Sequence, residues 1–223
     1  MGVAEHDGDL TVGHFQPGFW KRAAALTTLT FIDSAIANVS TITIPATAAG
    51  GDVAILFDNV ADTGTPTDVV PTGWTGIVTA TLGAIRLRVS YKILVSGDGG
   101  DSIAAMDGDL ANDKVMFVFR GNVAITGVTP SIWLSEVTGG NPSLQTVSAS
   151  GHAVPLLVLA MAAVTTGTGA FSTASPAFNA TVLDLGSNII AGYKIYNSSP
   201  ANHSIDMNDI GSNSLASGYL ICA

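Results

Sequence analysis

The segment from residue 70 to residue 95, VPTGWTGIVTATLGAIRLRVSYKILV, constrains the fold of this chain more than any other. From residue 85 onward its side chains alternate between apolar and polar, and a period of two is typical of a β-strand. The apolar positions are Ile85, Leu87, Val89, Tyr91, Ile93 and Val95. Successive side chains of a strand leave opposite faces of the sheet, so the polar positions should share the other face. We therefore expect a strand with one apolar face, which a second layer must cover.

The rest of the chain offers more short strands and no long amphipathic helix. Gly, Pro, Asn and Asp separate the apolar segments, as turns require. The expected strands cover residues 39–45, 52–59, 74–80, 85–95, 114–121, 132–137, 144–148, 153–164, 178–185, 188–196 and 215–222. This pattern predicts an all-β fold, an antiparallel β-sandwich of the jelly-roll-like kind, and argues against a parallel α/β sheet.

The sequence also contains an internal similarity at a constant offset. Tyr91-Lys92-Ile93 recurs as Tyr193-Lys194-Ile195, and the same offset aligns Ser102-Ile103 with Ser204-Ile205. Two related halves would explain the recurrence, whereas chance similarity between strands of like composition is the alternative. The halves would span residues 37–138 and 143–223, on either side of a Gly-Gly-Asn-Pro linker.

The first 36 residues differ from the body that follows, residues 37–223. Phe15, Phe19 and Trp20 lie there beside Gly and Pro residues. We expect an extended N-terminal arm, which has no core of its own for these aromatic rings. The rings would pack either on the body of the same chain or on a neighbouring subunit, and we predict them as partner-binding residues.

Charge and hydropathy exclude several classes of partner. The net charge is −9, with 17 acidic against 8 basic residues, which argues against a nucleic-acid partner. Only 11% of residues are charged, which suits a subunit partly covered by neighbours, although a soluble domain rich in small residues is the alternative. The start lacks the pattern of a secretory signal, and the longest apolar run is about half the ~20 residues of a membrane span. We therefore expect no membrane partner.

The acidic segment 97–113 holds the candidate metal ligands Asp98, Asp101, Asp107 and Asp109. Carboxylates spaced by Gly suit a hard cation such as Ca²⁺. The segment lacks the EF-hand pattern, and Asp and Gly are also the commonest turn formers, so solvated turns are the alternative. We expect no cofactor, because the four histidines show no ligand spacing either.

We expect no enzymatic activity. The sequence contains no Gly-x-Ser-x-Gly elbow, Cys/His pair or phosphate-binding loop. Nothing in it places two carboxylates at the separation that glycoside hydrolysis needs. The single Cys222 fits a small core residue better than a nucleophile.

Arg86, Arg88 and Lys92 form a basic stripe on the polar face of the segment described first. Such a stripe is usually a solvated outer face. In a chain with so few cations, it would alternatively meet the acidic surface of another subunit. We therefore count these three residues as partner-binding candidates.

Four segments, taken in order, resemble a β-rich module of tailed-phage virion proteins. They read TITIPATAAGGDVAILFD, VPTGWTGI, RLRVSYKILVSGD and DKVMFVFRG, and lie within residues 39–122. The module has a Gly-Asp before an apolar strand, a Pro-x-Gly-Trp turn, a Tyr-Lys or Tyr-Arg strand, and an aromatic-Arg-Gly step. The resemblance implies a jelly-roll-like β-sandwich in head decoration or tail positions, without catalytic residues. Residues 1–36 do not match the module.

From this resemblance we expect a structural protein located in the virion: a capsid cement or decoration subunit that stabilises the shell. Its partners would be the major capsid protein or other virion subunits, and it would form a homo-oligomer. The alternative is a tail-tip or fibre module that binds host surface carbohydrate. Trp74, Trp133 and Tyr196 would then be exposed stacking platforms.

Overall fold

The computed structural model describes residues 28–61, 70–82, 85–104, 113–121, 128–131, 145–147, 150–151, 154–164, 168–183, 189–210 and 215–222. All regular elements within these residues are β-strands, and their pairings are antiparallel. No helix in this part of the chain is long and apolar enough to span a membrane. The predicted all-β antiparallel fold is confirmed.

Two five-stranded sheets form the centre of the molecule. The first has the order β1 (Thr30–Ala37), β7 (Asp113–Arg120), β3 (Val53–Ala61), β5 (Ile85–Ile93), β4 (Thr75–Leu82). The second has the order β12 (Ala180–Leu183), β13 (Ile189–Tyr196), β10 (Leu156–Val164), β15 (Leu215–Cys222), β8 (Val128–Ser131).

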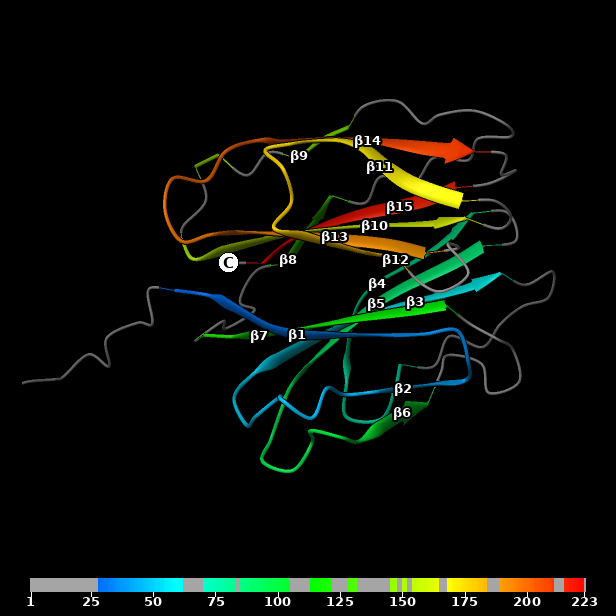
Figure 1. Ribbon diagram of the computed structural model, residues 1–223, viewed down its shortest axis with the longest axis vertical. Helices are drawn as coiled ribbons and strands as arrows, with labels where there is room; N and C mark the ends of the chain where they lie inside the picture. Colours follow the sequence, from blue (N-terminus) through cyan, green and yellow to red (C-terminus); the bar gives the residue numbers. More distant parts are fainter. Residues whose placement is uncertain are drawn as a thin grey trace, which may run out of the picture.

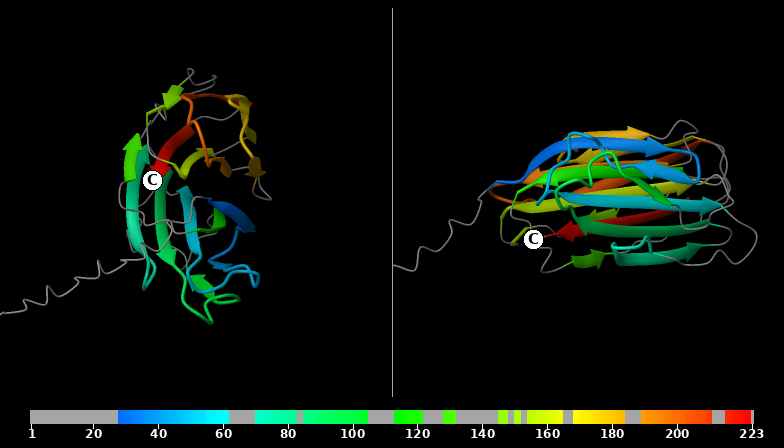
Figure 2. Two further views of the ribbon diagram at one scale, coloured as in Figure 1. Left: turned by 90° about the vertical axis from the view of Figure 1, so that its left-hand side faces the viewer. Right: turned by 90° about the horizontal axis from the view of Figure 1, so that it is seen from below.

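Two smaller sheets complete the described fold. One pairs β2 (Thr41–Thr43) with β6 (Ser102–Ala104). The other has the order β11 (Thr168–Ser175), β14 (His203–Ile210), β9 (Gln145–Val147). The two five-stranded sheets lie face to face, with the β2–β6 sheet outside the first and the β11–β14–β9 sheet outside the second (Figure 1). Strands of the two central sheets run in nearly the same direction, as in an aligned sandwich (Figure 2).

The central core fills the space between the two five-stranded sheets. Phe31, Phe117, Phe119 and Tyr193 form an aromatic cluster there. The Phe31 and Tyr193 rings stack with their centroids 4.9 Å apart, and Phe117 meets Tyr193 edge-on at 5.2 Å. Such contacts add about 0.5–1.5 kcal/mol per pair to the burial of the rings. The cluster therefore ties β1 and β7 of the first sheet to β13 of the second.

A second core lies on the outer face of the first sheet. Ile42 and Ile44 from the β2 segment pack there against Leu56, Met116 and Trp74. Both faces of β3 and β7 are therefore buried, because Phe117 faces the central core while Met116 faces the outer one. This explains the nearly continuous apolar run along β7, since a strand covered on both sides has no solvated face.

The polar face of β5 is not solvated. Arg88 and Ser90 are both 0% exposed, although their alternation with apolar residues predicts an open face. Ile93 and Val95, expected on the buried face, are 53% and 62% exposed. The middle of this face of β5 is therefore covered, whereas the apolar positions at the end of the segment are open to solvent. The prediction of a one-sided strand is therefore wrong.

The sandwich begins before residue 37. Leu29 belongs to the central core, and residues 30–36, which we expected in the arm, form most of β1. β1 pairs with β7 along its length, with one irregularity near Phe31. The predicted aromatic arm residues Phe15, Phe19 and Trp20 lie outside the described residues, as does the expected strand at 132–137.

Asn197 joins the start of β1 to the second sheet. Its side-chain Oδ1 accepts from the Leu29 backbone N–H at 2.7 Å, and its Nδ2 donates to the Leu29 carbonyl at 3.2 Å. We expect Asn197→Ala to lower the free energy of unfolding by about 1–2 kcal/mol, because two partly buried hydrogen bonds are lost. Asn202→Ala is the matched control, because the bond that its Oδ1 accepts from the Ser150 N–H is exposed. Equal changes in the urea midpoints of the two variants would contradict this interpretation.

Candidate functional site

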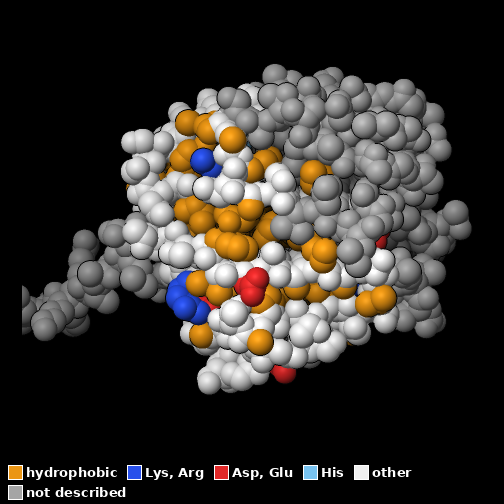
Figure 3. Space-filling model, in the orientation of Figure 1, with side chains coloured by type: hydrophobic (Ala, Val, Ile, Leu, Met, Phe, Trp, Pro, Cys, Tyr) orange, Lys and Arg blue, Asp and Glu red, His pale blue; other side chains and the backbone are white. Residues whose placement is uncertain are grey.

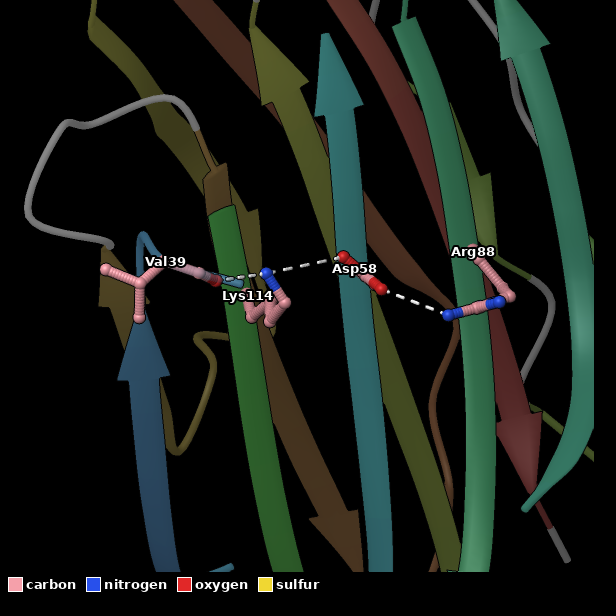
Figure 4. A network of polar contacts seen from close by, with 4 residues as sticks. All are labelled: Val39, Asp58, Arg88 and Lys114. Atoms are coloured by element: carbon pink, nitrogen blue, oxygen red, sulfur yellow. Dashed lines mark hydrogen bonds and ion pairs between the residues drawn. The ribbon is translucent and has the colours of Figure 1, made fainter. Parts of the chain in front are cut away.

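A row of three charged side chains crosses the outer face of the first sheet. Asp58 on β3 lies directly opposite Arg88 on β5 and opposite Lys114 on β7. Arg88 donates to Asp58 Oδ2 at 3.0 Å, and Lys114 Nζ lies 3.9 Å from Asp58 Oδ1 (Figure 4). Lys114 also donates to the Val39 carbonyl at 2.6 Å. All three charged side chains are fully buried.

The charge row has two cations and one carboxylate. Burial lowers the pKa of Lys114, and the Asp58 carboxylate opposes this effect. Arg88 carries its charge at any ordinary pH, so Asp58 is its natural counter-ion. The arrangement holds three strands in one register, and none of its groups reaches the surface. It therefore has the geometry of a structural network, with no access for a soluble ligand.

The expected basic stripe does not exist as one surface. Arg88 belongs to the buried charge row, so the prediction that it faces solvent or a partner is wrong. Lys92 is only partly exposed and donates to Asp98 Oδ1 at 2.9 Å. The side chain of Arg86 lies outside the described residues. The physical reason is that two of these cations are paired within the chain, Arg88 with Asp58 and Lys92 with Asp98.

The acidic segment is a turn in the part that the structure describes. Asp98 accepts from Lys92 and, at 2.7 Å, from the Val95 backbone N–H. The hydrogen bond from Lys92, followed by that from Val95, lowers the pKa of Asp98. The backbone carbonyl of Asp101 accepts from the Ile44 N–H. Asp107 and Asp109 lie outside the described residues, and the described ones contain no group of three or more His, Cys, Asp or Glu arranged for a metal.

Asp52 and Arg120 form an ion pair that our sequence analysis missed. Arg120 donates to the two carboxylate oxygens of Asp52 at 2.7 and 2.8 Å, and the Ala49 N–H adds a bond at 2.8 Å. The Arg120 hydrogen bond is the main cause that lowers the pKa of Asp52. The two residues belong to the Gly-Asp and aromatic-Arg-Gly steps of the resemblance. That co-occurrence is the signal that would have found the pair.

Asp52 and Arg120 should contribute unequally to the free energy of unfolding. We expect Asp52→Ala to cost about 2 kcal/mol, because it removes a buried carboxylate that accepts from two residues. Arg120→Ala should cost less, because Arg120 is 52% exposed and Asp52 keeps its bond from Ala49. Urea unfolding of both variants tests the order. An Arg120→Ala loss equal to the Asp52→Ala loss would contradict it.

The carbohydrate alternative needs exposed aromatic rings. Trp74 and Tyr196 are each only 7% exposed, and Trp74 packs in the outer core. Neither side chain can serve as a stacking platform in this fold. Trp133 lies outside the described residues. The structure therefore corrects the expectation for two of the three rings.

His203 is a buried titratable group in the second half of the chain. Its Nε2–H donates to the Pro176 carbonyl, and its ring meets Phe178 edge-on at 4.9 Å. A carbonyl only accepts, so the proton must lie on Nε2 and Nδ1 must be bare. Nδ1 has no hydrogen-bond partner among the described residues. Burial, with a smaller contribution from Lys194, lowers the pKa of His203 to about 4.

The fold and these contacts define an all-β sandwich protein in which the described charged groups mainly stabilise the structure. Comparison of the chain with protein-family models, curated proteins and solved structures returned no match.

Proposed function

We propose that this protein is a non-enzymatic structural component of a tailed-phage virion, a cement or decoration subunit on the capsid. Its partners would be the major capsid protein or other virion subunits, with further copies of itself in a homo-oligomer. The resemblance over residues 39–122 supplies the class. The observation that carries the proposal is the pairing of charged side chains within the chain. Asp52, Asp58 and Asp98 each form an ion pair with a cation of the same chain.

The surface that remains has few charges. On the face seen in Figure 3, hydrophobic and uncharged side chains cover most of the described surface, and charged groups occur at only a few points. Covering a surface of this kind with a neighbouring subunit costs little desolvation free energy, because few charged groups leave water. Burial contributes about 25 cal/mol per Å² of apolar area, so modest contacts become useful when they repeat over a shell.

Three of the five exposed large aliphatic side chains among the described residues lie at one end of the sandwich, whereas Ile36 and Val39 lie at the other. Ile93 and Val95 lie where β5 ends, beside the start of β3. Val154 precedes β10 and is 43% exposed. The Leu29–Asn197 contact brings the corresponding ends of the two sheets together. We assign this end, which the chain also enters before β1, as the capsid-facing end.

Binding to particles that lack the protein tests the proposal. We expect the full chain to occupy regular positions on such shells, as seen by electron microscopy. Removing residues 1–20 should abolish binding without changing the urea midpoint. Ile93→Asp with Val95→Asp should weaken binding, whereas Val39→Asp, an exposed position at the opposite end of the first sheet, should not. Failure to bind particles, together with Ca²⁺-dependent binding to host glycans, would overturn the proposal.

A further inference from the structure

The two five-stranded sheets have corresponding strand orders. If β5 corresponds to β13 through the shared Tyr-Lys-Ile sequence, the neighbours on both sides follow in the same order. Reading outward, β3 then corresponds to β10, β7 to β15, β1 to β8, and β4 to β12. The boundary between the halves therefore lies between β7 and β8, before the expected Gly-Gly-Asn-Pro linker, because β8 belongs to the second sheet. With this boundary, each sheet is also covered by a smaller sheet formed from the same half of the chain. Strands that come in the same order within each half of the sequence therefore occupy the same place in their sheets.

The correspondence extends to single residues. Starting from Tyr91 and Tyr193, the residues directly opposite one another on successive strands form one row across each sheet. The row in the first sheet is Ser34, Phe117, Ile55, Tyr91, Thr75. The row in the second sheet is Pro130, Leu220, Leu159, Tyr193, Ala180. In the outer sheets, Ser102 lies opposite Thr43 and its sequence counterpart Ser204 lies opposite Thr146.

The same positions face the central core in both halves. Val53, Ile55 and Phe57 of β3 belong to this core. Their counterparts by register are Leu157, Leu159 and Met161 of β10, and all three belong to it as well. A one-residue slip would turn a strand's side chains to the opposite face, so the agreement excludes such a slip between the halves.

The way in which the sheets stack reveals the relation between the halves. β7 contacts β13, for example where the Phe119 ring meets Tyr193 at 5.3 Å. Exchanging the halves turns β7 into β15 and β13 into β5, and β5 and β15 are also in contact. A two-fold axis has this property for this pair of contacts, because it maps one inter-sheet contact onto another. The contacts of β4 with β15 and β8, and of β5 with β10, have weaker counterparts in the exchanged halves, so the axis is a pseudo-two-fold one. A simple translation of one half would instead place β7 on its own counterpart.

We infer that this chain is two copies of one β-module fused in tandem, which pack through the same sheet face about a local two-fold axis. The inner face of each sheet is thus shaped to bind a second copy of that module. The fused interface is isologous, like that of a two-fold homodimer. This inference is independent of the proposed function, because it rests on the recurrent Tyr-Lys-Ile sequence, the register and the stacking of the sheets.

Spin-label distances in the full chain test the inference. Four double-cysteine variants, each in a Cys222→Ser background, carry labels at counterpart positions: 75 with 102, 180 with 204, 75 with 204, and 180 with 102. The first two distances lie within one half, and the last two cross between halves. Each variant is retained if its urea midpoint equals that of Cys222→Ser.

Two pairs of spin-label distances are expected to be equal. The 75–102 and 180–204 distances should agree, because the halves are copies. The 75–204 and 180–102 distances should also agree, since an operation that is its own inverse makes the two cross distances equal. Within-half distances that differ by more than the widths of their distributions would overturn the duplication. Unequal cross distances would overturn the two-fold axis.

Discussion

Replacing Asp58 with alanine is expected to lower the free energy of unfolding by about 3–5 kcal/mol. The substitution removes the carboxylate that lies between the buried Arg88 guanidinium and the buried Lys114 ammonium. Neither cation can reach water without opening the outer core, since both are fully buried. Urea unfolding with an unchanged slope would show this as a fall in the midpoint.

A triple variant separates the net contribution of the charge row to the free energy of unfolding from the loss caused by removing only its carboxylate. The register counterparts of Arg88, Asp58 and Lys114 in the second sheet are Ile190, Ala162 and Ser217. We therefore expect Asp58→Ala combined with Arg88→Ile and Lys114→Ser to recover most of the lost stability, because no charge remains buried. An Asp58→Ala loss below about 1 kcal/mol, the size of an ordinary surface effect, would show that the row is not electrostatically coupled.

The strands that sequence predicted well are those with long aliphatic or alternating segments. β3, β5, β7, β10 and β13 were all expected within a few residues of their observed bounds. β1, β6, β8, β11 and β14 were missed. Small and polar residues make up most of β1, β6, β8 and β11, and in β14 only Ile205 and Met207 alternate with polar residues over a short stretch. Such strands are held by pairing with a neighbour, as β1 is by β7, and that partner is distant in sequence.

The charge row shows why the candidate site could not be predicted in the same way. Alternation along β5 correctly separated Arg88 from Val89, but a solvated polar face and a covered, paired one have the same period. What distinguishes them is the partner Asp58, which comes from a different strand, 30 residues away in the sequence. The Asp52–Arg120 ion pair could have been predicted from the sequence, because its two residues belong to two short motifs of the resemblance.

His203 should make the stability of this protein depend on pH in a defined window. Its pKa is about 4 in the folded protein and about 6.5 in the unfolded chain, so the unfolded chain takes up the proton first as pH falls. The free energy of unfolding should therefore decrease from about pH 6.5 to about pH 4, by at most roughly 3 kcal/mol. Below that window this residue contributes no further change.

The His203→Phe variant isolates the effect. Phenylalanine retains an aromatic ring and cannot be protonated, but it loses the bond to the Pro176 carbonyl. We expect the variant to be less stable than the natural protein at pH 7, and the difference to shrink or reverse by pH 4. Asp52 and Asp98 have lowered pKa values, so their stabilisation is lost mainly below about pH 4 and does not obscure this window. Parallel curves for the two proteins between pH 7 and pH 4 would mean that the His203 ring reaches water or an acceptor for Nδ1 when it is protonated.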